Sequence, residues 1–435
     1  MTGTAPLPTP ATTAPARRRA LVAASIGNFI EWYDFTVYGL VAVVIAPLFF
    51  PSADPVASLL ATFGVFGLGF VVRPLGALVF GSLGDRVGRR RTLATVILLM
   101  AGGTALIGVT PTYAAVGVLA PLLLIVGRVL QGFSAGGEYA GASTYIVEYA
   151  PDGRRGYYAS WQSFSQILGV LFGSVVSVAV TTTLSPAAVT SWGWRVPFLV
   201  SVPFAGVALY LRLWLEETPH FRTVEVTHHV ERSPLATGLR SQVRGILVAL
   251  GLYALSTGGA YIYFIYMPTY LQAQLHLPPA RALLSNIVSL CVLLALAPVV
   301  GRLTDRVGRR PVLLAGSIAV LVLSYPLFLL LAAGSFPLTV LAQAVGCAVL
   351  SLAIVPQVAL IAELFPTSVR LSSFALATAL GVVLFGGTAP LVSTYLIAAT
   401  GNALAPAYFV MFTALLCTVA AWVTDDPWRA ELREW

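Results

Sequence analysis

The segment Gly81-Ser-Leu-Gly-Asp85-Arg86-Val-Gly88-Arg89-Arg90 decides the predicted fold, because it returns in the second half of the chain as Gly301-Arg-Leu-Thr-Asp305-Arg306-Val-Gly308-Arg309-Arg310. Each copy lies between two long apolar stretches, so the aspartate ends one predicted helix and the arginines begin the next. A repeated connection at equivalent places predicts two parallel repeats of one helical bundle.

The composition places those bundles in a membrane. Of 435 residues, 58% are hydrophobic and only 10% are charged, with a mean hydropathy of +0.87. Soluble domains carry about 25% charged residues. Apolar stretches of about 20 residues or more fit transmembrane helices, whereas the strands of a barrel would alternate over about 10 residues.

The apolar stretches therefore predict an all-α membrane protein with twelve transmembrane helices in two six-helix halves. The predicted spans are residues 20–50, 57–82, 92–110, 114–148, 156–182, 194–215, 243–273, 280–301, 311–333, 337–363, 371–398 and 405–424. The predicted domains are a disordered cytoplasmic tail (1–19), an N-terminal bundle (20–215), a central cytoplasmic loop (216–242), a C-terminal bundle (243–424) and a cytoplasmic tail (425–435).

The distribution of charge orients the chain and excludes several functions. Nearly all arginines fall in alternate loops, which predicts that those loops and both termini are cytoplasmic, in the inner membrane. The net charge of +8 is thereby explained without a nucleic-acid partner. The sequence has no lysine, which excludes a Walker A phosphate loop and a Schiff-base enzyme. Each cysteine lies alone in an apolar stretch, so we expect no disulfide, metal site or cofactor.

The first span carries two acids within the stretch from Gly27 to Tyr38. An acid at bilayer depth costs roughly 2.5 kcal/mol or more, so Glu31 and Asp34 are expected to face a protein interior. Asn28 and Tyr38 share that polar face and are predicted to line a substrate site. Asp34 is the predicted proton carrier, and Glu31 is a second candidate.

Arg73 and Arg128 are the two arginines that the predicted spans place near mid-depth, and both are predicted to contact substrate. Counting residues from the helix ends puts Arg128 and Asp34 at overlapping depths, which predicts an ion pair. If Arg128 turned to an anionic substrate, Asp34 would gain by taking a proton, because an unpaired buried charge is costly. A purely structural ion pair is the alternative.

Further polar residues at helical spacing are candidates for the cavity wall. Gln162 and Gln166 lie one turn apart in the fifth span, and Tyr253, Thr257 and Tyr261 form a stripe in the seventh. Such residues either bind substrate or pack helices together. Glu138, which follows two glycines, is a candidate for the proton site, with a packing role as the alternative.

The repeated loops are predicted to act as a gate, because ion pairs there can clasp neighbouring helices in one conformation and release them in another. The alternative is that topology alone favours arginines on that side. The residues concerned are Asp85, Arg86, Arg89 and Arg90 in the first copy and Asp305, Arg306, Arg309 and Arg310 in the second.

The doubled loop resembles the signature of the major facilitator superfamily. The segments Gly27-Asn28 to Asp34-Phe35, Gly127-Arg128 to Glu138-Tyr139 and Trp192-Gly-Trp-Arg-Val-Pro-Phe198 are similar to its metabolite:proton symporter family. That resemblance implies a monomeric, non-enzymatic transporter that moves a small molecule with protons through the lipid bilayer, and it supports the Asp34–Arg128 pair. It also implies a second cytoplasmic charge network made by Glu148 with Arg154 and Arg155 and by Glu363 with Arg370.

The substrate class is drawn from shorter similarities. The segments Ser160 to Gln166, Phe385 to Pro390 and Thr400 to Asn402 are most similar to the citrate carriers of that family, which implies a citrate-like carboxylate or 2-oxoglutarate. The alternative is a zwitterion such as proline or betaine, held in a cation cage of Trp32, Tyr33 and Phe35. A sensor built on a transporter fold is the rival from another class.

Overall fold

A computed structural model describes residues 14–87, 89–137, 139, 142–143, 146–147, 150–151, 153–213, 242–365 and 370–426. These residues are helical apart from short turns and form no strand. The N-terminal half contains α1 (Ala14–Leu40), α2 (Ala42–Phe49), α3 (Pro55–Val71), α4 (Arg73–Val87), α5 (Arg89–Val109), α6 (Tyr113–Val116), α7 (Leu119–Ser134), η1 (Ala135–Gly137), α9 (Arg155–Thr183), α10 (Pro186–Ser191), η2 (Gly193–Arg195) and α11 (Val196–Leu213).

The C-terminal half contains α14 (Val243–Tyr261), α15 (Met267–Ala273), α16 (Pro279–Val307), α17 (Arg309–Ala332), α18 (Phe336–Leu364), α19 (Arg370–Gly381), α20 (Ala389–Thr400) and α21 (Ala405–Val423). Two π-helical segments interrupt it, η3 (Ile262–Tyr266) after α14 and η4 (Val382–Gly386) after α19.

The described part of each predicted span falls on one helix or on consecutive helices. Among the described residues, eight helices are long and apolar enough to cross a membrane, and the bent pair α1 and α2 makes a ninth. The other three predicted spans fall on α5, α7 and α11. The 64° bend between α1 and α2 was not predicted, although Gly39 lies two residues before Val41.

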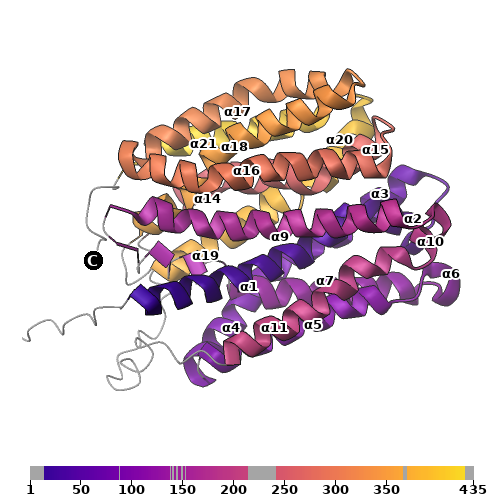
Figure 1. The fold of residues 1–435 in the computed structure, drawn as a ribbon, viewed down its shortest axis with the longest axis horizontal. Coiled ribbons are helices and arrows are strands. Elements are labelled where there is room, and N and C mark those ends of the chain that lie inside the picture. The colour runs from indigo at the N-terminus through magenta and orange to yellow at the C-terminus, as the bar shows by residue number, and fades with distance from the viewer. Residues whose placement is uncertain are drawn as a thin grey trace, which may run out of the picture.

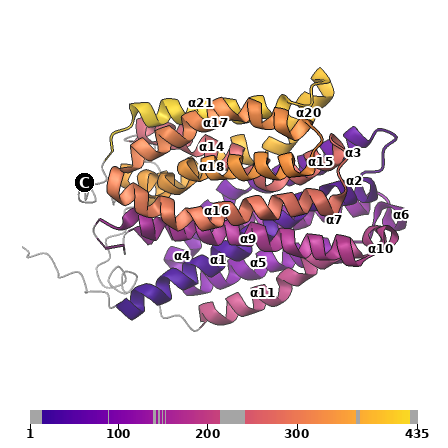
Figure 2. The same cartoon turned by 45° about the horizontal axis from the view of Figure 1, so that its top comes forward.

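The helices run roughly parallel, with the two halves side by side (Figure 1). Figure 1 and Figure 2 both show α9 lying along α16, where the halves meet. The end at which α9 begins and α16 gives way to α17 is called the arginine-rich end below. Both termini of the described chain lie at this end (Figure 1), as an even number of crossings requires.

Glycines allow the close helix contacts that bring the central arginines together. A Cβ atom on Gly132 of α7 would collide with the backbone carbonyl of Gly69 on α3. Small residues at such positions let helix backbones approach closely in membranes. The side chain of Arg128, one turn before Gly132, consequently lies against Gly69 and reaches the neighbourhood of Arg73 at the start of α4.

Candidate functional site

Four buried charged side chains form the central charge cluster, Glu31, Asp34, Arg73 and Arg128, of which Asp34 and Arg128 are fully buried. They come from α1, α4 and α7 of the N-terminal half. Arg73 Nη2 donates to Glu31 Oε1 at 2.7 Å. The sequence did not indicate Glu31 as the partner of Arg73, because residue counting along helices gives no information on which faces meet.

The predicted ion pair between Asp34 and Arg128 is wrong for this conformation. Arg128 instead donates from Nη1 to Oε1 of Gln131 at 2.9 Å and from Nη2 to the carbonyl of Phe66 at 3.1 Å. Neither carboxyl oxygen of Asp34 has a hydrogen-bond partner among the described residues. The sequence predicted only the depth of Arg128 in the membrane. The direction of its side chain depends on the hydrogen-bond acceptors on its own helix and on α3.

Aromatic rings surround both guanidinium groups. The Cζ atom of Arg73 lies 4.4 Å from the centre of the Phe35 ring and 5.0 Å from that of Phe70. The Cζ atom of Arg128 lies 4.7 Å from the Tyr38 ring centre and 4.9 Å from that of Phe66. These contacts stabilise buried cations. Phe35 therefore serves a cation of the protein itself, which removes it from the predicted cage for a substrate.

The two halves meet at this cluster through Trp32 and Tyr261. Their ring centres are 5.7 Å apart, and the ring of Tyr261 also contacts Phe66 and Phe70 of α3. Trp32 Nε1 and the Tyr261 hydroxyl are buried without a hydrogen-bond partner among the described residues. Buried polar atoms are normally paired, so unpaired ones where the two halves meet are candidate ligand contacts.

Several residues that were predicted to contact substrate instead make hydrogen bonds within the protein. Asn28 donates to the carbonyl of Gln162 and to Ser165, and Tyr38 donates to the carbonyl of Thr62. Thr257 donates to backbone carbonyls, including that of Gly381. These side chains hold helices together in this conformation.

Other predicted contacts remain available. The amide group of Gln162 is buried and makes no hydrogen bond with the described residues. Gln166 is buried one turn away, and the ring of Tyr253 is tilted against that of Tyr139, with ring centres 6.0 Å apart. The best candidates for substrate contact are therefore Trp32, Gln162 and Tyr261.

Sequence analysis missed the groups that surround Asp34 and Arg128. Thr104 of α5 and Ser201 of α11 are the polar side chains beside Asp34. Gln131 links Arg128 to Thr104, because its Nε2 donates to Thr104 Oγ1 at 2.7 Å. The position of Gln131 three residues after Arg128, on the same helix face, was the available signal.

A charge network joins the halves at the arginine-rich end. The two oxygens of Asp305 accept the backbone N–H groups of Gly156 and Tyr157, each at 2.8 Å, at the beginning of α9. Arg309 lies 3.4 Å from Asp305 and 3.2 Å from Glu363. Arg155 of α9 lies 3.8 Å from the same glutamate. The contacts of Asp305 and Glu363 with the beginning of α9 join the two halves at this end, and their role as a gate stays a prediction.

The remaining predicted gate residues divide into two groups. Arg154 and Arg306 are exposed, Arg370 donates to the carbonyl of Phe365, and Arg310 binds the end of α21 through the carbonyls of Ala421 and Trp422. These hydrogen bonds of Arg370 and Arg310 do not cross between the halves. The side chains of Asp85, Arg86, Arg89 and Arg90, and the residues Glu138 and Glu148, lie outside the described part of the structure.

The substitution Asp305→Asn is expected to loosen the arginine-rich end. Asparagine keeps one acceptor but loses the charge and the second oxygen that cap α9. A Ser160→Cys substitution supplies a reporter thiol, because Ser160 is buried against Gly301. In the Asp305→Asn variant, alkylation of that thiol should be about fivefold faster, which corresponds to a loss of about 1 kcal/mol from the capping contact. Arg306→Gln, at an exposed neighbour, is the control; equal rates in both variants would contradict a clasp at Asp305.

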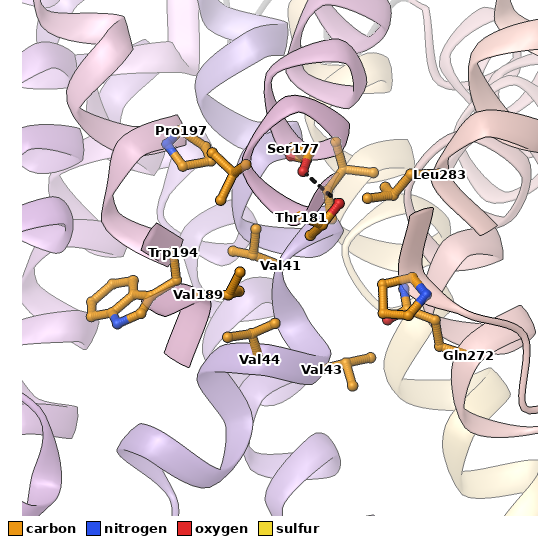
Figure 3. A pocket seen from close by; sticks show the side chains of 13 residues that line it. Val41, Val43, Val44, Ser177, Thr181, Val189, Trp194, Pro197, Gln272 and Leu283 are labelled. Carbon is orange, nitrogen blue, oxygen red and sulfur yellow. Dashed lines mark hydrogen bonds between the residues drawn. The ribbon is translucent and has the colours of Figure 1, made fainter. Parts of the chain in front are cut away.

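A separate hollow lies at the opposite end of the bundle, where α2, α9, α10 and α16 approach one another (Figure 3). Valine and leucine side chains dominate its lining, with Ser177, Thr181 and Gln272 as polar members. The Thr181 hydroxyl is already bonded to the Ser177 carbonyl. This hollow does not include the central charge cluster. The described residues also contain no group of three or more His, Cys, Asp or Glu side chains suited to a metal.

The fold and the buried site between two six-helix halves define a transporter. The family model "Sugar (and other) transporter" matches residues 20–239 and again residues 228–424. The chain belongs to this family, within the major facilitator superfamily, and is a multi-pass membrane protein rather than an enzyme.

Several curated relatives have similar identity. The glycine betaine/proline/ectoine/pipecolic acid transporter of Dickeya dadantii and the proline/betaine transporter of Escherichia coli K12 are each 38% identical, over 92% of this chain and 81% of their own. The citrate-proton symporter of Klebsiella pneumoniae is 37% identical over 95% of this chain and 93% of its own. The structure resembles that of the proton:xylose symporter XylE, with a TM-score of 0.77, 17% identity and coverage of 96% and 98%, a likeness in fold alone.

Proposed function

We propose that the chain is a proton-coupled symporter that carries a small zwitterion of the glycine betaine and proline class by alternating access. The observation that carries this proposal is the charge balance of the central cluster, where two arginines face two acids in a buried setting. The names of the relatives support it, since two of those described above transport betaine or proline.

The balance of charge favours a substrate with no net charge. With Glu31 and Asp34 ionised, the cluster is neutral, and one proton on Asp34 makes it singly positive. A zwitterion has no net charge and leaves the net charge of the cluster unchanged in both protonation states. A fully ionised tricarboxylate would leave two negative charges uncompensated even with one proton bound. An uncompensated buried charge costs several kcal/mol, so the neutral substrate is the less costly one.

The available groups suit the two ends of such a zwitterion. Arg73 Nε and Arg128 Nε are buried donors without a hydrogen-bond partner among the described residues, and they can receive a carboxylate. Trp32 and Tyr261 present aromatic surface where a quaternary or secondary ammonium would be stabilised. We also infer that a monomer suffices and that the arginine-rich end faces the cytoplasm.

A carboxylate such as citrate remains the second candidate substrate, because the Klebsiella relative is nearly as similar and covers more of its own length. The two arginines suit it equally. Its coupling would require more than one proton for each substrate, or a cation carried with it, to offset the additional charge.

Binding by purified protein distinguishes the two substrate classes. Glycine betaine and proline should raise the temperature of unfolding and citrate should not. The substitution Trp32→Ala should weaken the apparent affinity for betaine about tenfold, because a desolvated cation–π contact contributes up to about 2 kcal/mol. Trp192→Ala, at an exposed tryptophan, is the control. Stabilisation by citrate alone would overturn the zwitterion assignment.

A further inference from the structure

We propose that Gln131 is a positioning residue for proton coupling, which keeps Arg128 away from Asp34 until substrate arrives. This inference rests on the proposed role of Asp34 as the proton carrier. It deepens that role by naming the group that prevents a permanent ion pair.

The side chain of Gln131 has hydrogen bonds on both sides. Its Oε1 accepts Arg128 Nη1 at 2.9 Å, and its Nε2 donates to Thr104 Oγ1 at 2.7 Å. The second terminal nitrogen of Arg128 is held by the Phe66 carbonyl at 3.1 Å. Gln131 is itself fully buried. The orientation of the guanidinium group is therefore fixed by two neutral acceptors.

Thr104 places this arrangement beside the acid. The Thr104 hydroxyl donates to the Met100 carbonyl at 3.0 Å while it accepts from Gln131, so it has no proton to offer Asp34. Two described hydroxyl groups face Asp34, those of Ser201 on α11 and Thr104 on α5. The charged or titratable groups near it are Arg128 on α7 and Glu31 and Tyr33 on α1. Asp34 thus lies near an arginine that is turned toward another acceptor.

A neutral acceptor has a specific advantage over the carboxylate. If Asp34 accepted the guanidinium, each would cancel the charge of the other, and both substrate binding and protonation would have to break a buried ion pair. Gln131 satisfies Arg128 without cancelling its charge. Arg128 remains attractive to a substrate carboxylate, and Asp34 remains able to take a proton from water.

Removal of the Gln131 amide should therefore uncouple transport rather than abolish binding. In Gln131→Leu, Arg128 loses its Nη1 acceptor and the nearby carboxylate of Asp34 becomes the alternative. We expect accumulation of labelled glycine betaine driven by a pH gradient to fall about tenfold in proteoliposomes, while exchange without a gradient changes less than about twofold. If the wild type exchanges citrate instead, citrate is the probe.

Companion variants separate this role from a structural one. Thr104→Val should act in the same direction as Gln131→Leu, and Thr104→Ser should behave as wild type. Gln343→Leu removes another buried glutamine, which donates to Ser285 in the C-terminal half, and should not separate the two readouts. Adding Gln131→Leu to Asp34→Asn should leave exchange at the level of Asp34→Asn alone, because the target of the released arginine is gone.

Three results would overturn the inference. In the first, Gln131→Leu leaves both readouts at wild-type values. In the second, it lowers exchange and accumulation by one common factor, as a packing defect does. In the third, it lowers exchange severalfold in the Asp34→Asn background. If Asp34→Asn itself accumulates substrate normally, the proposed proton role fails first, which is a distinguishable outcome because it needs no Gln131 variant.

Discussion

Asp34→Asn is expected to reduce accumulation of substrate against its gradient to the level of empty vesicles, while exchange of labelled for unlabelled substrate continues. The amide is close to the carboxyl in shape but cannot take up and release a proton. Neither carboxyl oxygen of Asp34 has a hydrogen-bond partner in the described geometry, and the neighbouring hydroxyls of Thr104 and Ser201 can face an amide as well as a carboxyl. The measurement is paired accumulation and exchange in proteoliposomes across a range of external pH, where exchange by the variant should lose its dependence on pH.

The control for Asp34→Asn is Asn28→Asp, which adds a carboxyl on the same helix. Asn28 donates a hydrogen bond to the carbonyl of Gln162 on α9, which the aspartate would lose. That variant should weaken packing and lower exchange and accumulation together. Proton-driven accumulation by Asp34→Asn at the wild-type level would assign proton carriage to another group and refute the role given to Asp34.

Breaking the Glu31–Arg73 pair should cause the largest loss of stability. Removal of one partner from a buried ion pair leaves an uncompensated charge, which costs about 3–5 kcal/mol. Both side chains are at least nine-tenths buried and their bond is 2.7 Å long. Glu31→Gln and Arg73→Met are each expected to lower the free energy of unfolding by that amount, measured by denaturation of the purified protein in detergent.

The double variant Glu31→Gln/Arg73→Met should be more stable than either single variant, because no charge is left unpaired. Arg154→Ala, at an exposed arginine, serves as the control and should change stability by less than about 0.5 kcal/mol. If the two single losses simply add in the double variant, the pair does not stabilise the fold as an ion pair.

The fold was predictable from the sequence because hydropathy and the repeated loop are properties of the local sequence. Span lengths and the division into halves depend on local composition, and each predicted span falls on helix. The bend at Val41 and the π-helical segments η3 and η4 were not predicted. Near the bend, Gly39 packs closely against Ile265 of η3, a contact between the halves that local composition does not report.

The pairings within the site were less predictable. Residue counting placed Asp34 and Arg128 at similar depth, but the orientation of Arg128 depends on Gln131 and on the Phe66 carbonyl. Predicting the partner of Arg73 would have required knowing which faces of α1 and α4 pack together. Sequence patterns report which residues are buried far better than they report which buried groups meet.

The substrate class was inferred from motifs that have structural roles here. Ser165 accepts a hydrogen bond from Asn28, and Ser160 packs against Gly301 where α9 meets α16. In the eleventh span, Gly386 and Gly387 admit the rings of Tyr261 and Phe70. Apart from Gln162, these similarities to citrate carriers concern helix packing, so they carry little information on the substrate.

The central claim, that substrate and proton cross together, is tested most directly by recording lumenal pH and labelled glycine betaine in the same proteoliposomes. Adding glycine betaine outside, with no pH gradient, should acidify the lumen in step with uptake, and Asp34→Asn should take up betaine down its gradient without acidification. Betaine uptake by the wild type with no change in lumenal pH, or acidification produced by citrate and not by betaine, would contradict the account.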